Sequence, residues 1–328
     1  MPQHLTATLR RCLAGLLALL ALAVGAQTAP GPYPSRPIKV LVGVPPGGST
    51  DALTRVFADW LQESMGQPAV VENKPGANTA VAADLVARAA PDGYTLLVAT
   101  EAFITMPLLT KPPYDPFKDF TPVGTVGVNR FVMSVHPAVP VSTLKEFIAY
   151  AKVRPGQLNF GSSGNAGASH IGLEKFKMLT GTFITHIPYR GAGPALTDGI
   201  AGQYQASMWT PLALSPYLKA GKFKPLAVTG PRRIPFMPDV PTFAEAGLPG
   251  FDHRSWLSVY APAGTPKPIV DRLNAEITKM LTSPKIRQKL EGSGVEPLVS
   301  TPEQLTELNH EETALLQKMV KAVNIKMD

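Results

Sequence analysis

Short β-branched strands and amphipathic helices alternate along nearly the whole chain, and this alternation restricts the possible folds more than any other feature. The first run has a strand pattern at 38–44, a helical repeat at 51–65, a strand at 69–72, a helix at 80–90 and a strand at 95–99. Strands that alternate with helices pair in parallel, because each crossover helix returns the chain to the same end of the sheet. We therefore predict an α/β fold whose first sheet is parallel and covered by helices on both faces.

A proline-rich break at 104–122 and an apolar stretch at 123–135 interrupt this rhythm before it resumes. Helices are then expected at 143–152, 169–179, 195–201 and 212–219, with strands at 158–160, 184–187, 205–209 and 225–228. A second proline-rich passage, 231–249, precedes a strand at 257–260 and helices at 268–281 and 302–321. Two such passages around a middle α/β unit predict one domain inserted into another.

We therefore expect a two-lobed α/β fold in which each lobe is a mainly parallel sheet flanked by helices. The first domain would hold residues 33–125 and 250–328, and the inserted second domain would hold residues 126–249. Two lobes joined by two crossings form a hinge beside a cleft, which suits closure on a ligand.

The first 26 residues have the three parts of a cleavable secretory signal. Arg10 and Arg11 supply the positive charge, residues 13–24 are apolar and uncharged, and small residues at 24–26 suit the cleavage enzyme. A transmembrane anchor is the alternative, but the apolar run is shorter than the ~20 residues that span a bilayer. We expect residues 1–26 to be removed as a signal peptide and the chain to be exported to the periplasm.

Composition then limits the chemistry of the exported chain. Cleavage after Ala29 is an alternative that leaves this argument unchanged. Cys12 is the only cysteine, so the cleaved chain would have neither disulfides nor thiolate metal ligands. It would carry 29 basic and 24 acidic side chains without a basic block. We therefore expect no nucleic-acid partner and a mild preference for small anions.

Two glycine-rich loops, each between a predicted strand and a predicted helix, are the main candidates for ligand binding. The start of a helix leaves N–H groups unpaired and carries partial positive charge, and glycine lets a ligand approach the backbone closely. Capping by Ser49, Thr50 or Asp51 is the alternative role for the first loop. The candidate holders are Pro46, Gly47, Gly48, Ser49, Thr50 and Asp51 in the first loop and Ser162, Ser163, Gly164, Asn165, Ala166 and Gly167 in the second.

Catalysis and cofactor binding have little support in the sequence. The second loop lacks the Gly-Lys-Ser/Thr of a P-loop and the glycine spacing of a dinucleotide site, so we expect no cofactor. It also lacks the lysine and acids that a phosphate-binding transferase would need. An exported serine hydrolase using Ser163 and His170 is the alternative function. However, no Gly-x-Ser-x-Gly surrounds Ser163, and a triad histidine usually comes from a separate segment.

Histidines and aromatic side chains give weaker signals. We interpret His170 as a structural histidine, and the other histidines show no metal-ligand spacing, so no metal site is expected. Phe103 follows a predicted strand, and Trp209 ends another, beside Thr210. All three would line the cleft. Core packing is the alternative for the two aromatic residues.

Several sequence blocks, in one order from Tyr33 to the C-terminus, resemble the Bug family of periplasmic solute-binding proteins, the receptor components of tripartite tricarboxylate transporters. Pro46 and Ala166 depart from the family, where alanine and glycine are usual. The blocks are Tyr33–Ile38, Val44–Asp51, Glu72–Ala77, Pro91–Leu97, Pro113–Phe120, Gly161–His170, Pro188–Gly191 and Ala261–Pro266.

The resemblance implies a periplasmic flytrap that captures a small carboxylate and delivers it to a tripartite tricarboxylate-type transporter or to a sensor. In the family, the two loops hold the carboxylate with backbone amides, hydroxyls and water. Family members bind amino-acid, nicotinate, aliphatic and aromatic carboxylates. Phe103, Trp209 and Thr210 would contact the rest of the ligand, which favours an aromatic or dicarboxylic acid such as terephthalate. We expect the protein to be a monomer without catalytic activity.

Overall fold

The computed structural model describes residues 33–323, with side chains to residue 320. The expected signal peptide, both cleavage sites and Cys12 lie outside these residues. Within them, no helix is both long enough and apolar enough to cross a membrane.

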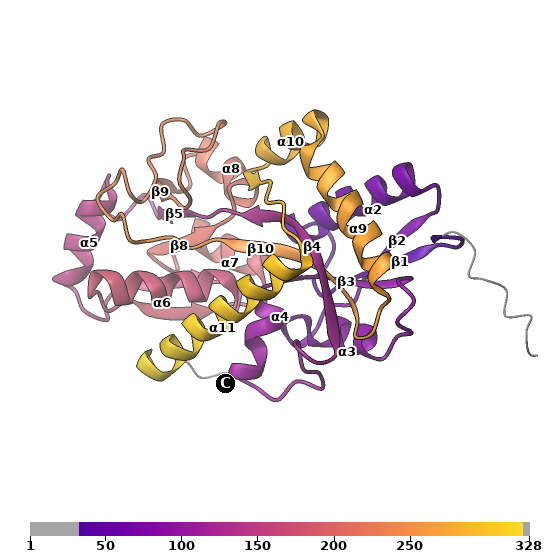
Figure 1. The fold of residues 1–328 in the computed structure, drawn as a ribbon. Coiled ribbons are helices and arrows are strands. Elements are labelled where there is room, and N and C mark those ends of the chain that lie inside the picture. The colour runs from indigo at the N-terminus through magenta and orange to yellow at the C-terminus, as the bar shows by residue number, and fades with distance from the viewer. Residues whose placement is uncertain (1–32, 324–328) are drawn as a thin grey trace, which may run out of the picture. The chain divides into compact units, whose positions relative to one another are not determined.

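The first sheet has six strands in the order β11-β4-β10-β3-β1-β2 (Figure 1). As predicted, β1 pairs in parallel with β2 and with β3. The sheet as a whole is mixed rather than mainly parallel, because β10 returns from the second sheet and enters antiparallel between β3 and β4. The strands are β1 (Ile38–Val42), β2 (Ala69–Asn73), β3 (Thr95–Thr100), β4 (Phe120–Asn129), β10 (Ser255–Pro262) and β11 (Val295–Glu296).

Helices cover both faces of this sheet, as the alternation predicted. Helices α2 and α9 contact each other and β4, whereas α3 contacts β3 and β10. Leu41 and Leu97 are buried with Ala83 of α3 and Leu305 of α11. Adjacent strand residues point to opposite faces, and Val40 is also fully buried. The helices are α2 (Ser49–Met65), α3 (Ala80–Ala87), α4 (Ala102–Thr105), α9 (Lys267–Thr282), α10 (Pro284–Glu291) and α11 (Pro302–Val323), with short 3₁₀ turns η1 (Ala77–Thr79) and η2 (Met106–Leu108).

The second sheet has five strands in the order β7-β6-β8-β5-β9. β6 pairs in parallel with β7 and β8, and β5 pairs antiparallel with β8 and β9. Every strand and helix predicted here is present, with boundaries shifted by a few residues at most. The predicted elements are α5 (Leu144–Lys152), β6 (Asn159–Ser162), α6 (Ala168–Thr180), β7 (Thr185–Pro188), α7 (Ala192–Ile200), β8 (Ala206–Trp209), α8 (Pro211–Lys219) and β9 (Lys224–Val228). The strand β5 (Val132–Val135) lies in the apolar stretch 123–135, where no separate strand was predicted.

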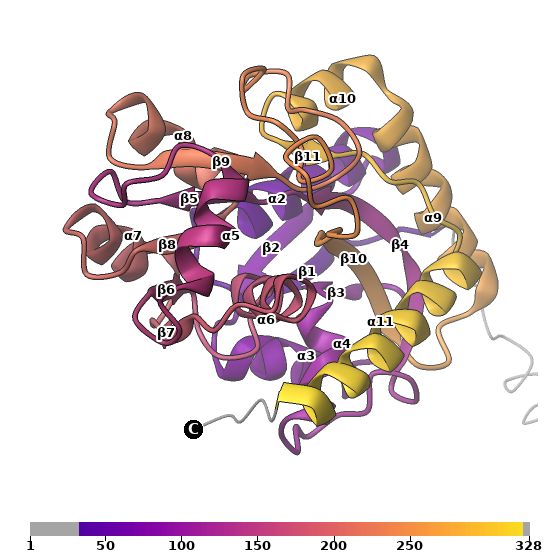
Figure 2. The same cartoon turned by 90° about the vertical axis from the view of Figure 1, so that its left-hand side faces the viewer.

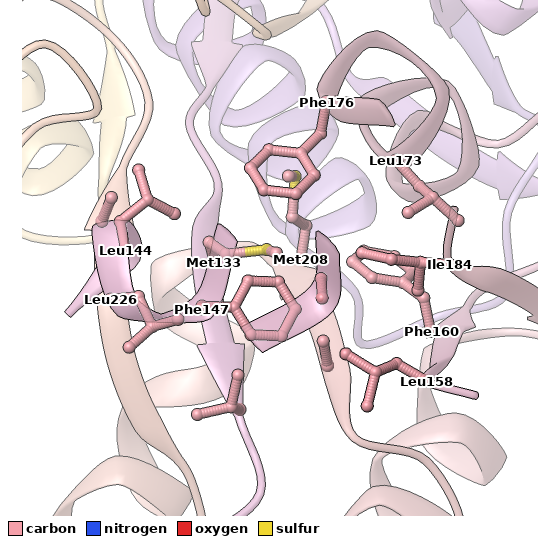
Figure 3. Close-up of a cluster of buried hydrophobic side chains, with 14 of the residues drawn as sticks. Met133, Leu144, Phe147, Leu158, Phe160, Leu173, Phe176, Ile184, Met208 and Leu226 are labelled. Carbon is pink, nitrogen blue, oxygen red and sulfur yellow. The ribbon is translucent and has the colours of Figure 1, made fainter. Parts of the chain in front are cut away.

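Side chains of alternating strand residues divide the second core into two halves. On one face, Met133 and Met208 pack with Phe147 of α5 and Phe176 of α6 (Figure 3). On the other face, the next residues, Val132 and Trp209, belong to a separate buried cluster with α7 and α8 residues. This two-residue period is what a strand buried on both faces requires.

The first passage between the sheets is shorter than the sequence suggested. β4 keeps the chain in the first sheet to Asn129 and β5 begins at Val132, so only residues 130–131 make the passage. The predicted domain boundary at 126 therefore falls inside β4. The proline-rich segment 104–122 does not cross between the sheets but runs from α4 back to β4.

The second proline-rich passage, 231–249, packs with the second sheet. Val228 forms a parallel bridge with Thr242, and Phe243 is buried in the Met133 cluster. The two passages are joined directly, because Nε of Arg130 donates to the carbonyl oxygen of Thr229 at 2.6 Å.

A buried carboxyl group lies where β10 begins. Glu101, between β3 and α4, is 4% exposed, and its Oε2 accepts a hydrogen bond from Ser255 Oγ at 2.5 Å. Nearby, Nζ of Lys175 in α6 contacts Oε1 of Glu312 in α11 at 3.3 Å. Burial raises the pKa of Glu101 to about 7, with a further contribution from the charge of Glu312 and an opposing one from the Ser255 hydrogen bond.

We predict that Glu101 makes the protein less stable as the pH rises from about 4.5 to above 7. Its folded pKa lies above its unfolded value of 4.5, so its contribution is fully present below pH 4.5 and is lost as the pH rises through 7. The difference approaches about 3 kcal/mol. Glu101→Gln should remove this pH dependence in urea unfolding between pH 5 and 8, whereas Glu307→Gln, an exposed control on α11, should keep it. Equal pH slopes for all three proteins would contradict the prediction.

Candidate functional site

The first predicted ligand loop connects β1 to α2 and is exposed along its tip. Residues 45–48 are exposed, and Gly47 has a left-handed φ of 95°. Helix α2 begins after Gly48, and no side chain caps it there. The capping alternative for Ser49 and Thr50 is therefore not observed, and the first N–H groups of α2 are left for solvent or a ligand.

The buried side chain of Asp51 holds this loop in shape. The residue is 3% exposed. Its Oδ2 accepts from the Gly47 N–H at 2.9 Å and from Arg55 Nε at 3.1 Å, and its Oδ1 accepts from Asn73 Nδ2 at 2.8 Å. Asn73 Nδ2 also donates to the Val44 carbonyl at 3.0 Å. Both oxygens of Asp51 are thus engaged within the loop and its supports.

These contacts fix the ionisation of Asp51. Burial alone would raise its pKa, but the hydrogen bonds from Arg55, Asn73 and the Gly47 N–H outweigh burial and hold the pKa below the usual value. The carboxylate is therefore charged at neutral pH, and the charge of Arg55 lies beside it.

A strained turn that the sequence analysis did not single out lies against the same loop. Ala77, Asn78 and Thr79 have consecutive left-handed φ values of 43°, 49° and 80°. A Cβ on Gly43 would lie 2.5 Å from Cα of Thr79, so only glycine fits at the end of β1. Left-handed φ values cost non-glycine residues about 1–3 kcal/mol each. The Pro75-Gly76 pair was the available sequence signal for a turn, but it carries no information about three strained residues.

The second predicted ligand loop connects β6 to α6. Ser162 is fully buried; its Oγ accepts from the Gly164 N–H at 3.1 Å and lies 2.5 Å from Nε2 of His186. Ser163 and Gly164 are partly exposed, and the Ser163 N–H donates to Ser169 Oγ at 3.1 Å. Helix α6 begins after Gly167 without a capping side chain. The second loop therefore resembles the first: its acceptors are engaged internally, and a helix start is left uncapped.

Two stacked histidines support this loop. The rings of His170 and His186 lie 3.7 Å apart. Burial, with the charge of His170 adding to it, lowers the pKa of His186 to about 3, so this imidazole is neutral. Nδ1 of His170 accepts from the Ala166 N–H at 3.0 Å, and its Nε2 lies 3.7 Å from Glu174. Because Nδ1 already accepts a backbone hydrogen bond, this contact supports the interpretation that His170 stabilises the loop rather than acting as a catalytic base.

The geometry also bears on the hydrolase alternative. The side-chain contact of Ser163 is with Ser169, at 3.4 Å between the two Oγ atoms. The histidine that contacts a loop serine is His186, and its partner is the fully buried Ser162. The pairing of Ser163 with His170 that this alternative requires is not formed in the described residues.

The aromatic candidates lie in the core. Phe103 is fully buried, with ring centroids of Phe120 and Tyr260 each 4.8 Å away. Trp209 is 3% exposed and belongs to the cluster on the α7–α8 face of the second sheet. Both aromatic residues therefore have the core packing that was the alternative to lining a cleft. Thr210, at the start of α8, is partly exposed.

A cavity of about 170 Å³ is lined by residues of the first loop and α2 and by a residue of α8, a helix that packs on the second sheet. Its wall includes Ser49 at the start of α2 and Leu212 of α8. Lys289 of α10 and Ser293, which follows α10, complete this wall. Residues 162–167 do not line this cavity. Among the described residues, no group of three or more His, Cys, Asp or Glu side chains is arranged to hold a metal ion.

We predict that Asp51→Asn will loosen the first loop and lower the free energy of unfolding by about 2 kcal/mol, because hydrogen bonds to a charged group are lost. The folded pKa lies below the unfolded value of 3.8, so this stabilisation is present above about pH 3.8 and disappears as the pH falls through the folded pKa. Urea unfolding at pH 7 and pH 3 measures both effects. Asp59→Asn, an exposed position on the same helix, serves as the control. A variant as stable as the wild type at pH 7 would refute this role of Asp51.

Comparisons with known proteins identify the family of the chain. Residues 53–325 match the model of the TctC family, described as the tripartite tricarboxylate transporter family receptor. The chain is 36% identical over 288 residues to protein BugT of Bordetella pertussis, covering 87% of each chain. Among solved structures, a protein of R. palustris with adipate is 36% identical, with a TM-score of 0.82 over 90% of this chain and 99% of that one. MatC from Rhodopseudomonas palustris with bound malate is 34% identical, with a TM-score of 0.76 over 88% and 100% of the two chains.

Proposed function

Because the chain belongs to the TctC family of tripartite tricarboxylate transporter receptors, we propose that it is a periplasmic binding protein that captures a small dicarboxylate and has no catalytic role. Two similar proteins were solved with adipate and with malate, and both of these ligands are dicarboxylates. The expected signal peptide would direct this chain to the periplasm.

The observation that carries this proposal is the pair of glycine-initiated helices that follow β1 and β6. Neither α2 nor α6 has a capping side chain at its first residues. Helix α7 also begins after a glycine, Gly191, without a capping side chain, whereas Thr143 and Glu146 form a complete capping box at the start of α5. Uncapped N–H groups and the partial positive charge of a helix start favour a carboxylate.

In the two loops, some groups would bind the ligand and others would keep the loop in shape. We propose that the N–H groups of 48–51, of Asn165 and of the first turn of α6 (168–170) hold the ligand, together with the hydroxyl groups of Ser49, Thr50 and Ser163. The N–H groups of Ser163, Gly164 and Ala166 donate within their own loop and would keep its shape. Asp51 and Ser162, whose polar atoms are engaged within their own loops, would hold the loops in shape. Among the three further candidates, Thr210 is the one with exposed surface, so it remains our candidate for contacting the rest of the ligand.

The two sheets suggest how the loops would meet a ligand. We propose that the sheets form two lobes, the first reaching Asn129 and resuming at Ser255, with the ligand bound between them. A ligand that contacts both loops would favour a closed arrangement, because it gains contacts only when the lobes approach. The closed form would then be recognised by the membrane transporter, or by a sensor.

We predict that adipate or malate will raise the melting temperature of the purified protein, because a ligand that binds only the folded state stabilises it by mass action. Gly48→Val should weaken this ligand's affinity at least about tenfold, because a side chain would block the backbone. Gly48 has an ordinary φ of −82°, and a Cβ there meets no atom within 4 Å, so the variant should fold.

Gly193→Val in α7 is the matched control, since a Cβ there also meets nothing within 4 Å. Thermal shift and calorimetry with a panel of mono-, di- and aromatic carboxylates, including terephthalate, would identify the ligand. If no carboxylate stabilises the protein, or if Gly48→Val binds as well as the wild type, this proposal is wrong.

The hydrolase alternative makes a different prediction. A chromogenic ester should not be hydrolysed above the buffer rate, because His170 Nδ1 accepts a backbone N–H rather than a serine proton. Ester turnover that is abolished by Ser163→Ala, but kept by Ser169→Ala, would favour the hydrolase instead.

A further inference from the structure

A second cavity, of about 280 Å³, lies next to the first passage between the sheets and is lined by four arginines. One wall is the segment Pro231–Pro235, which follows β9, and the other is formed by residues of α10 and the turn into β11. Figure 2 shows the loop after β9 beside α10 and β11. The charged lining residues are Arg130, Arg232, Arg233, Arg287, Glu291 and Glu296.

Two of the arginines are committed to the protein itself. Arg130 is 6% exposed, and its guanidinium donates to the carbonyl oxygens of Thr229 and Arg232. Arg233 forms an ion pair with Glu245 at 2.9 Å. These contacts hold the Pro231–Pro235 wall in place without requiring a ligand.

The other two arginines, Arg232 and Arg287, are exposed and form no ion pair within the described residues. They stand on opposite walls of the cavity. Burial lowers the pKa of Arg130. Among the nearby charges Glu296 has the largest effect and raises this pKa, whereas Arg254 and Arg232 lower it. Arg130 therefore lies within the fields of both Glu296 and Arg232, which line the same cavity.

The lining has four positive and two negative side chains, and Arg233 is already paired with Glu245 outside the lining, so one positive charge in excess is left for an anionic ligand. The prolines at 231, 235 and 297 have no N–H to donate, so recognition would come from guanidinium groups. Guanidinium groups bind phosphate and carboxylate oxygens in pairs of parallel hydrogen bonds. The volume of about 280 Å³ lies just below the range of about 300–1,000 Å³ for pockets that bind drug-sized molecules, so the cavity suits a smaller ligand.

We propose that this cavity is a second binding site, for a small oxyanion such as a phosphate or a polycarboxylate, and that Arg232 and Arg287 are its principal ligands. It is separate from the proposed dicarboxylate site in both place and chemistry. None of the residues 46–51 and 162–167 lines it, and it offers cationic side chains where the two loops offer backbone N–H groups.

Isothermal titration of the purified protein with inorganic phosphate, and separately with citrate, tests this site at low ionic strength with matched sodium chloride as the blank. The double variant Arg232→Gln/Arg287→Gln should bind the anion at least tenfold more weakly, because two charge-assisted pairs are lost. Lys285→Gln removes one charge from the same helix outside the cavity and should bind like the wild type. Which of the two anions binds more tightly distinguishes a phosphate site from a polycarboxylate site.

Two further results separate this site from the dicarboxylate site. Gly48→Val should keep phosphate binding, and the double arginine variant should keep dicarboxylate binding. The proposal is overturned if neither anion gives saturable binding at millimolar concentration, or if the double variant binds both as tightly as the wild type. Phosphate binding lost in Gly48→Val but kept in the double variant would place the anion in the loop site and would also overturn it.

Discussion

The pairing of β10 with both β3 and β4 is the interaction on which the rest of the structure depends. It inserts a strand from late in the chain between two early strands. The first sheet therefore consists of segments that precede and follow the second sheet in the sequence. The beginning of β10 is also where Glu101 meets Ser255, while Arg130 ties the first passage to the second at Thr229. Buried polar contacts thus gather where the chain passes between the sheets, and this is the region that would move if the lobes close.

The two candidate loops share the same arrangement of hydrogen bonds and helix start. In each, a buried polar side chain accepts a hydrogen bond from a loop N–H: Asp51 from Gly47 and Ser162 from Gly164. Each loop then passes through glycine into a helix without a capping side chain. The buried side chains form hydrogen bonds that fix the shape of the loop, and the N–H groups at the helix start remain unpaired and could bind a ligand. This division explains why a carboxylate could be bound there without an arginine in contact with it, in contrast to the arginine-lined cavity.

Much of the fold could be predicted from the sequence, because strand and helix periodicities are local. Every predicted helix and strand after residue 36 is present in the structure, as is the parallel pairing of β1, β2 and β3. The apolar stretch 123–135 does carry the chain from the first sheet to the second, but it consists of two strands, and the predicted boundary at 126 falls inside the first of them. Hydrophobicity alone cannot show that break, since both strands are buried. The short helix α10 and strand β11 were also missed, because neither is long enough to show a clear period.

By itself, the sequence determined the α/β class, the positions of two glycine-rich helix starts and the family resemblance, since each of these depends on residues close together in the chain. Only the tertiary structure decided how those residues are used. It placed Phe103 and Trp209 in the core and paired Ser162 with His186, 24 residues away. It also brought Arg130, Arg232 and Arg287 to one cavity. Burial and long-range contacts are properties of the packed chain, and the same side chain can line a ligand site or fill a core according to what packs against it.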